Sequence, residues 1–212
     1  MPAIDVSFKI NGEKLPADHG YPMLSAVSRM VPSIHSDSTC GIFPVNGVNT
    51  GDRFIAVTDR SRLVFRVSHE KLPILLNLAG KKLLVRECSI RLGTPEVFAL
   101  KPSARLKSRL VTIKGFMEPE PFLEAAVRQL SEMGINGKPS LAIRASQRSA
   151  AMAEAACHYV RRTLRVKDKE IVGYAMIVES LTAEESILLQ EKGIGGRRRM
   201  GCGLFVPYKR KE

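Results

Sequence analysis

Large aromatic side chains are scarce in this chain of 212 residues. It contains no tryptophan, four tyrosines and eight phenylalanines. Proteins that read single-stranded nucleic acid by base stacking place aromatic side chains in characteristic short motifs. Neither Phe98 nor Phe205 stands in a motif of that kind. The sequence therefore does not support recognition by base stacking.

Patterns typical of metal sites and membrane spans are also missing. The four cysteines stand far apart and form no Cys-x-x-Cys pair, so a zinc site has no support in the sequence. No apolar run approaches the roughly 20 residues of a membrane helix, and no apolar run of the signal-peptide kind stands at the N-terminus. We therefore expect a cytoplasmic protein with reduced thiols, and neither a metal, a cofactor nor a membrane partner.

Acidic residues are few compared with basic ones. The chain has 33 lysines and arginines against 21 aspartates and glutamates, and its net charge is +12. An excess of this size indicates a polyanionic partner, nucleic acid before membrane. The stretch 101–114 has no acidic residue, and its basic residues are Lys101, Arg105, Lys107, Arg109 and Lys114. A second basic cluster consists of Arg161, Arg162, Arg165 and Lys167. For any one of these residues the alternative is a solvated strand face.

A glycine-rich segment near the C-terminus combines special backbone geometry with positive charge. Residues 193–203 read Gly-Ile-Gly-Gly-Arg-Arg-Arg-Met-Gly-Cys-Gly. Glycine permits positive φ and close backbone approach, successive N–H groups can form an anion site, and arginine binds phosphate bidentately. The pattern differs from the P-loop and from the dinucleotide fingerprint. It indicates a loop that holds a phosphate backbone; the alternative is a helix C-cap with solvent-facing arginines.

The order of predicted elements indicates an α+β protein. Ile4–Ile10 alternates apolar and polar residues as a half-buried strand does, and a helix is expected from about Pro22 until Pro32 ends it. A second helix is expected over 69–79, followed by further strands. This order favours a ferredoxin-like (RRM-like) split βαβ unit.

The second half of the chain repeats that plan. The stripe that begins at Leu123 predicts a helix, 159–178 predicts a hairpin, and Thr182–Glu185 is a capping box for a last helix that ends near Gly193. We expect two tandem ferredoxin-like domains, 1–102 and 103–212, with a C-terminal glycine-rich loop. The alanine-rich stretch 145–157 fits a helix or a connector equally well.

The spacing of the glycines resembles the glycine-rich loop of the CRISPR-associated RAMP superfamily. The combination with other stretches is similar to the endoribonucleases that mature CRISPR RNA, in the MYXAN-like subtype. These stretches are Pro16–Tyr21, Leu110–Gly115, Glu118–Phe122 and Ala183–Ser186. The resemblance covers most of the chain in order, and it implies the tandem fold and a role in RNA processing.

The resemblance implies an enzyme that binds CRISPR repeat RNA and cuts once within each repeat. In such enzymes the RNA 2′-OH attacks the adjacent phosphate without a metal, which gives a 2′,3′-cyclic phosphate and a 5′-OH. The mature crRNA is expected to stay bound, and other subunits of an interference complex are possible partners. The alternatives are a non-catalytic RNA-binding subunit of such a complex and a general basic RNA-binding protein.

The candidates for acid–base chemistry are histidines, whose reference pKa is about 6.5. The resemblance places the catalytic histidine at or just after the first helix, which makes His35 the first candidate and His19 the second. Tyr21 is expected to donate a hydrogen bond, and Lys114 to stabilise charge. The expected RNA contacts are Arg105, Lys107, Arg109, Arg161, Arg162, Gly193, Gly195, Arg197, Arg198, Arg199, Gly201 and Gly203.

Overall fold

The computed structural model describes residues 2–143 and 159–208. The chain forms two compact units, each with its own apolar core. The first unit comprises residues 1–100 together with Arg198–Gly201, and the second comprises 101–197 and 202–212. The alanine-rich stretch 145–157 lies outside the described residues.

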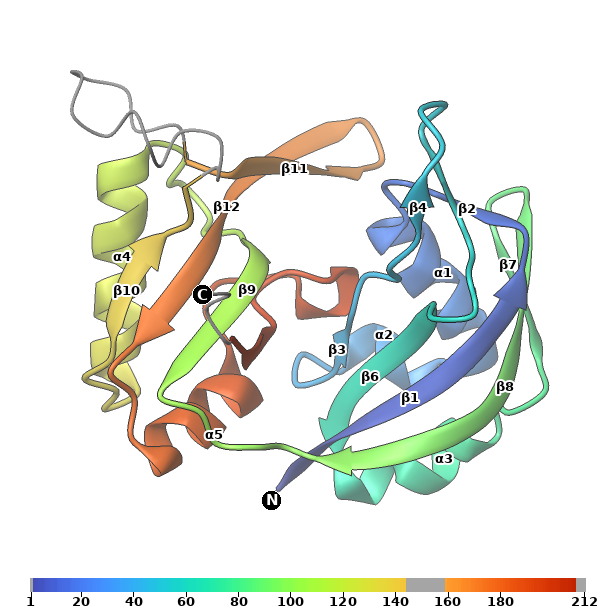
Figure 1. Cartoon of the computed structure of the whole chain (residues 1–212), viewed down its shortest axis with the longest axis horizontal. Coiled ribbons are helices and arrows are strands. Elements are labelled where there is room, and N and C mark those ends of the chain that lie inside the picture. The colour runs from blue at the N-terminus through green and yellow to red at the C-terminus, as the bar shows by residue number, and fades with distance from the viewer. Residues whose placement is uncertain (1, 144–158, 209–212) are drawn as a thin grey trace. The chain divides into compact units, whose positions relative to one another are not determined.

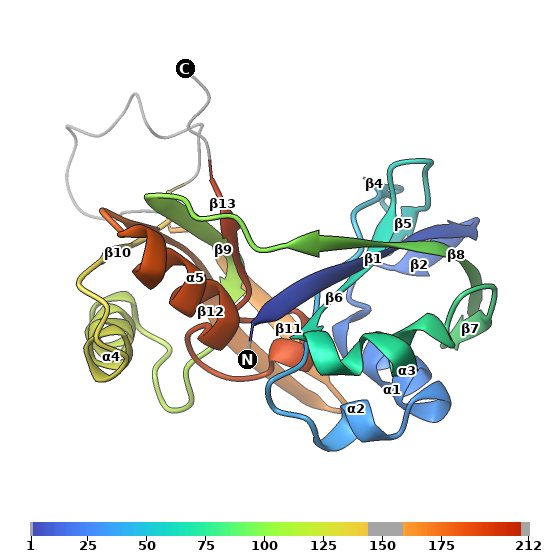
Figure 2. The same cartoon turned by 90° about the horizontal axis from the view of Figure 1, so that it is seen from below.

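The first unit is built on a five-stranded antiparallel sheet in the order β3-β6-β1-β8-β7 (Figures 1 and 2). Its elements are β1 Ala3–Gly12, β2 Lys14–Pro16, α1 Gly20–Met30, α2 Ser33–Ser36, β3 Gly41–Ile42, β4 Val48–Asn49, β5 Phe54–Ala56, β6 Arg62–Ser68, η1 His69–Lys71, α3 Leu72–Leu76, β7 Lys82–Val85 and β8 Cys88–Ala99. A small second sheet has the order β2-β5-β4.

The core of the first unit follows from the strand alternation that the sequence predicts. On β1, Val6, Phe8 and Ile10 are all buried, and β1 pairs with β6 on one side and β8 on the other. Helices α1 and α3 lie on the same face of this sheet (Figure 2). Helix α1 contributes Met23 and Val27 to the core. Burial of this apolar face, rather than helix propensity, holds α1 in place.

The second unit also contains a five-stranded antiparallel sheet, in the order β10-β12-β9-β13 with β11 paired to β12. Its elements are β9 Arg105–Val111, α4 Pro119–Glu132, β10 Lys138–Leu141, β11 Arg161–Val166, β12 Lys169–Glu179, α5 Ala183–Lys192, η3 Arg198–Met200 (which groups with the first unit) and β13 Phe205–Pro207. Helix α5 begins with the predicted capping box, in which Thr182 and Glu185 bond to each other's backbone N–H.

The two units share one strand order. Each unit contains a βαββαβ repeat whose first and third strands are central in the sheet and whose second and fourth strands are peripheral. The central strands are β1 and β6 in the first unit, in the order β3-β6-β1-β8, and β9 and β12 in the second, in the order β10-β12-β9-β13. This is the arrangement of a ferredoxin-like fold, so the predicted α+β class is confirmed. Among the described residues, no helix is long and apolar enough to cross a membrane.

Some boundaries differ from the sequence prediction. The helix expected over 69–79 is a 3-10 turn, His69–Lys71, followed by the short α3. Pro73 has no N–H to donate to the His69 carbonyl, which accepts from the N–H of Leu72 instead. The unit boundary falls at 100/101 rather than 102/103. Residues Arg198–Gly201, expected in the second domain, group with the first unit because η3 contacts α1 and β3 and Met200 packs on the first core.

Candidate functional site

His35 lies on α2, a single helical turn that directly follows α1. The neighbouring side chain, Ile34, is only 1% exposed and fixes the turn to the core, whereas His35 itself is exposed. The backbone N–H of His35 donates to the carbonyl of Pro32 at 3.0 Å. The fold thus presents the imidazole of His35 to solvent from a backbone that is anchored on the opposite side.

A groove of about 460 Å³ runs between α1 and α2 and contains His35. Its lining residues are Tyr21, Leu24, Ser25, Ser28, Arg29, Pro32 and His35. The five residues from α1 follow the i, i+3, i+4, i+7, i+8 spacing of one helix face. The groove therefore brings Tyr21 and His35 together and adds Ser28 and Arg29.

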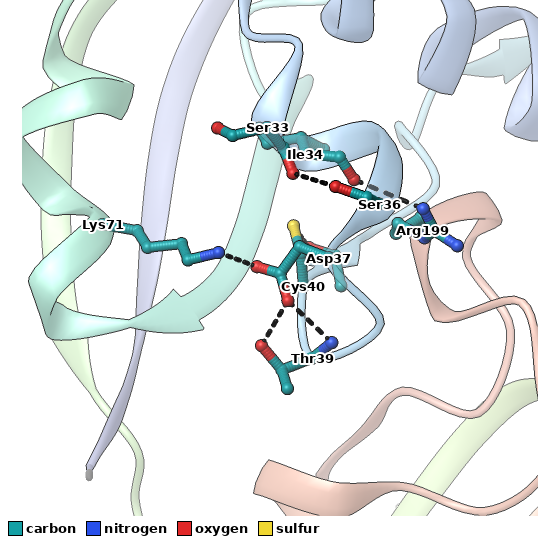
Figure 3. Close-up of polar contacts among 9 residues, drawn as sticks. Ser33, Ile34, Ser36, Asp37, Thr39, Cys40, Lys71 and Arg199 are labelled. Carbon is teal, nitrogen blue, oxygen red and sulfur yellow. Dashed lines mark hydrogen bonds and ion pairs between the residues drawn. The ribbon is translucent and has the colours of Figure 1, made fainter.

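The C-terminal end of α2 is held by an ion pair (Figure 3). Asp37 follows the last helical residue, and its carboxylate pairs with the ammonium of Lys71. It also accepts hydrogen bonds from the N–H and hydroxyl of Thr39, at 2.9 and 2.6 Å. Burial raises the pKa of the Asp37 carboxyl, but the bonds from Lys71 and Thr39 outweigh it and the pKa is lowered overall.

Arg199 provides a second anchor for α2. One of its terminal guanidinium nitrogens donates to the carbonyl of Ile34 at 3.4 Å (Figure 3). Cationic side chains stabilise the carbonyl end of a helix because that end carries partial negative charge. A residue expected to contact RNA from the glycine-rich segment therefore holds the turn that carries His35.

His19 is buried rather than exposed. It is 3% exposed at the start of α1. Its Nδ1 donates to the carbonyl of Pro16 at 2.8 Å and its Nε2 accepts from the N–H of Val45 at 2.8 Å. Both ring nitrogens are thus used by the backbone, which fixes a neutral tautomer. This geometry favours a structural role for His19 and leaves His35 as the better candidate for acid–base chemistry.

Lys114 belongs to the second unit. It is exposed at a tight turn in which Phe116 N–H donates to the Ile113 carbonyl at 3.2 Å and Gly115 has a φ of 88°. Lys114 is not among the residues that line the groove around His35. Its role in charge stabilisation stays a prediction.

A second groove, of about 490 Å³, lies in the second unit and is strongly basic. Its lining residues are Arg109, Leu110, Arg161, Arg162 and Thr163. The arginines come from β9 and β11, which flank β12 in the sheet. All three arginines are exposed. The fold thus gathers three of the predicted RNA-binding side chains on one concave surface.

The other two predicted contacts on β9 are engaged within the unit. Arg105 pairs with Glu179 at 2.5 Å on the neighbouring strand β12. The ammonium of Lys107 lies 4.8 Å from the centre of the Tyr208 ring, a cation–π distance. Neither residue lines the basic groove. Their contact with RNA stays a prediction that the geometry does not favour.

Two glycines of residues 193–203 allow close backbone packing. Gly195 has a φ of 73°, and a Cβ there would lie 2.2 Å from the carbonyl oxygen of Thr112. A Cβ at Gly203 would lie 2.3 Å from the carbonyl oxygen of Ile194. The N–H groups of Gly193, Gly195, Gly196, Gly201 and Gly203 all donate to protein acceptors. These amides are therefore not open to an anion, so the phosphate binding predicted for this segment would require the arginine side chains.

The three arginines of this segment differ in exposure. Arg198 is 7% exposed, and its guanidinium nitrogens have no hydrogen-bond partner among the described residues. Burial, and then the positive charge of Arg66, lower its pKa to about 10. Arg197 and Arg199 are half-buried. Only the latter two present a guanidinium that RNA could reach without rearrangement.

Sequence reasoning overlooked Arg29, Ser28 and Thr163. The two α1 residues were recognisable in principle, because positions seven and eight after Tyr21 lie on the same helix face. Thr163 follows Arg162 on a strand whose register the sequence alone does not fix. In the part of the chain that the structure describes, no three metal-ligating side chains gather at one point.

Comparison with known proteins places these features in a family. The family model described as Cas6, Cas6 Crispr, matches residues 4–210. The CRISPR-associated endonuclease Cas6 of Myxococcus xanthus is 34% identical over 207 residues, which cover 98% of this chain and 82% of that protein.

Two solved structures share the fold. A CRISPR associated protein Cas6 superposes with a TM-score of 0.66 at 12% identity and covers 98% of this chain and 100% of its own. An RAMP protein binding different RNA substrates gives 0.64 at 13% identity, with 99% and 100% covered. The match along nearly the whole chain, together with the two ferredoxin-like units, shows that the chain belongs to the Cas6 family of CRISPR-associated endonucleases.

Proposed function

We propose that this protein is an endoribonuclease that binds CRISPR repeat RNA and cuts the precursor within each repeat to give mature crRNA. The observation that carries the proposal is the groove in which exposed His35 lies with Tyr21, in a chain that matches the Cas6 family over residues 4–210. The basic groove of Arg109, Arg161 and Arg162 supports RNA as the substrate.

The proposed reaction uses the nucleophile that RNA already carries. The 2′-oxygen forms a bond to the adjacent phosphorus while the bond from phosphorus to the 5′-oxygen breaks. One proton leaves the 2′-OH and one reaches the 5′-oxygen, which leaves a 2′,3′-cyclic phosphate and a 5′-OH. No metal ion is needed in this scheme, because the protein can supply the proton transfers and the positive charge.

His35 is the group that transfers a proton in this scheme, as acid or as base. Its imidazole is exposed and its backbone is fixed by Ile34 and the Asp37–Lys71 pair, so it can meet a substrate without rearrangement of the fold. Tyr21 on the same groove can donate a hydrogen bond to the RNA. A positioned acid or base of this kind contributes about 10²–10⁴-fold to a rate.

The test is incubation of the protein with labelled repeat RNA in excess EDTA at a stated salt concentration. We expect a single cut by the wild type. The 3′ end of the upstream fragment should resist phosphatase until acid opens its cyclic phosphate. His35→Ala should abolish the cut. The matched control is His69→Ala, since His69 is also an exposed histidine of the first unit but lies outside the groove.

Two results would count against the proposal. A wild type that binds the repeat tightly but never cuts it would favour the non-catalytic RNA-binding subunit. Equal loss of cutting in His35→Ala and His69→Ala would show that cleavage does not depend specifically on the histidine in the groove. Loss of the cut in EDTA alone, with recovery in Mg²⁺, would overturn only the metal-independent scheme.

A further inference from the structure

The groove around His35 contains one residue with a fixed positive charge that the sequence alone did not single out. Cleavage by 2′-OH attack places extra negative charge on the non-bridging oxygens of the phosphate, and a cation close to those oxygens stabilises it. Of the described residues that line the groove, only Arg29 carries a permanent positive charge. We propose that Arg29 is a further catalytic residue, which binds the scissile phosphate; this rests on the proposed function.

Helix geometry places Arg29 correctly for this role. Arg29 lies in the last turn of α1, four residues after Ser25 and eight after Tyr21, so its side chain lies on the same face as both. The same groove continues through Pro32 to His35. A phosphate held by Arg29 is therefore held beside the proposed acid–base group.

One hydrogen bond fixes the guanidinium of Arg29 and leaves the others available. Its Nη2 donates to the carbonyl of Leu84 on β7 at 2.7 Å. A guanidinium has five N–H donors in a planar fork, so one bond to the backbone orients the group and leaves donors for two phosphate oxygens. Among the described residues, no carboxylate forms an ion pair with Arg29, so its charge is not neutralised.

A purely structural role is the competing explanation. Arg29 is the basic residue of the last turn of α1, where a cation stabilises the helix dipole. Arg91 offers a matched control, because it is an exposed arginine that donates to the backbone carbonyl of Gly80 at 3.4 Å, outside the groove.

The experiment compares Arg29→Ala, Arg29→Lys and Arg91→Ala in single-turnover cleavage of saturating repeat RNA. We expect Arg29→Ala to slow cleavage by about 10²–10³-fold, the loss seen when one oxyanion-stabilising donor is removed. Arg29→Lys should recover part of the rate, and Arg91→Ala should match the wild type. Added methylguanidinium should accelerate Arg29→Ala and none of the others.

The rescue separates catalysis from structure, because a soluble guanidinium can fill the space left in the groove but cannot restore a helix end. A slow Arg29→Ala with a lowered Tm and no rescue would overturn the proposal, as would wild-type rates in Arg29→Ala. A wild type that does not cut at all would instead refute the proposed function on which this inference rests.

Discussion

The two units share a strand order yet contain grooves of different chemistry. The groove of the first unit holds one histidine, one arginine and one tyrosine, whereas the groove of the second holds three arginines and no histidine. A histidine can transfer protons because its reference pKa lies near neutral pH, whereas arginine stays charged and acts by binding phosphate or stabilising negative charge. Under the proposed function, the first groove would carry the reaction and the second would bind the RNA backbone.

The two grooves lie on different elements of the two units. In the first unit the groove lies on the first helix, α1, and the turn after it. In the second unit it lies on strands β9 and β11. The comparison predicts that variants in the first groove change the rate of cutting and that variants in the second change affinity.

The largest expected effect concerns His35. His35→Ala should lower the single-turnover rate constant by about 10²–10⁴-fold and leave the Kd for repeat RNA within about threefold, because the removed group transfers a proton and contributes little ground-state binding. Rapid-quench cleavage and filter binding measure the two quantities on one preparation. A parallel loss of affinity would contradict the prediction that variants in the first groove change the rate of cutting but not the affinity for RNA.

A second prediction asks whether the first unit's chemistry is confined to the groove. His19→Ala leaves the Val45 N–H and the Pro16 carbonyl without their partner. Unsatisfied buried groups of this kind cost about 1–3 kcal/mol each, so urea unfolding should show a clear loss of stability. At a temperature where the variant is folded, the rate of cutting should be unchanged. A lower rate without a loss of stability would indicate that His19 is the acid–base residue.

The glycine-rich segment offers a test within a few residues. Gly195→Ala should destabilise the protein by about 1–3 kcal/mol, because alanine is strained at its positive φ and its Cβ would meet the Thr112 carbonyl. Gly196→Ala is the matched control, since a Cβ there meets nothing within 4 Å. Thermal unfolding gives both values. Loss of RNA affinity in a stable Gly196→Ala would show that the segment's backbone binds the ligand after all.

The second groove should govern affinity and its dependence on salt. Arg161→Ala combined with Arg162→Ala should weaken repeat binding and reduce the slope of log K against log salt by about 0.7 for each phosphate that the variant no longer neutralises. Lys138→Ala removes an exposed charge elsewhere in the same unit and should change neither. Binding titrations at several salt concentrations measure the slope for each variant. An unchanged slope in the double variant would exclude phosphate binding by these two residues.

The smallest expected effect is on acid stability of the first unit. The pKa of Asp37 is lowered in the folded state from 3.8, so its stabilising contribution is present above pH 3.8 and is lost as the pH falls through the lower folded value. Asp37→Asn should remove that part of the acid dependence and weaken the hold on α2. Urea unfolding between about pH 5 and pH 3 measures it; identical acid profiles would contradict the assigned role of the Lys71 pair.

Local patterns allowed much of the fold to be predicted. The alternation in β1, the capping box of α5 and the apolar stripe of α4 all appear where the sequence predicts them, because each depends on neighbours within a few residues. Strand β8 contains Gly93 and Pro95, two residue types that weaken strands. It is nevertheless continuous because pairing with β1 supports it, with a shift between Phe8 and Ile10.

The candidate site was harder to predict because it depends on burial. His19 and His35 both flank α1, and the sequence ranks them without showing that one is enclosed by the chain around Val45. Arg198 reads as a surface cation in a run of three, yet it is 7% exposed. The i+8 relation between Tyr21 and Arg29 was visible, but nothing in the sequence distinguishes a groove-lining arginine from a solvated one.

Residues Arg198–Gly201 belong to the first unit although they follow most of the second unit in the sequence, and this has a consequence for synthesis on the ribosome. Met200 packs against a core whose other members all lie before residue 93. Domains generally fold in the order in which they emerge, but Met200 and the Arg199 bond to α2 are added to the first unit only after α5 has been made. A nascent chain that ends before residue 198 would therefore carry His35 without these two contacts.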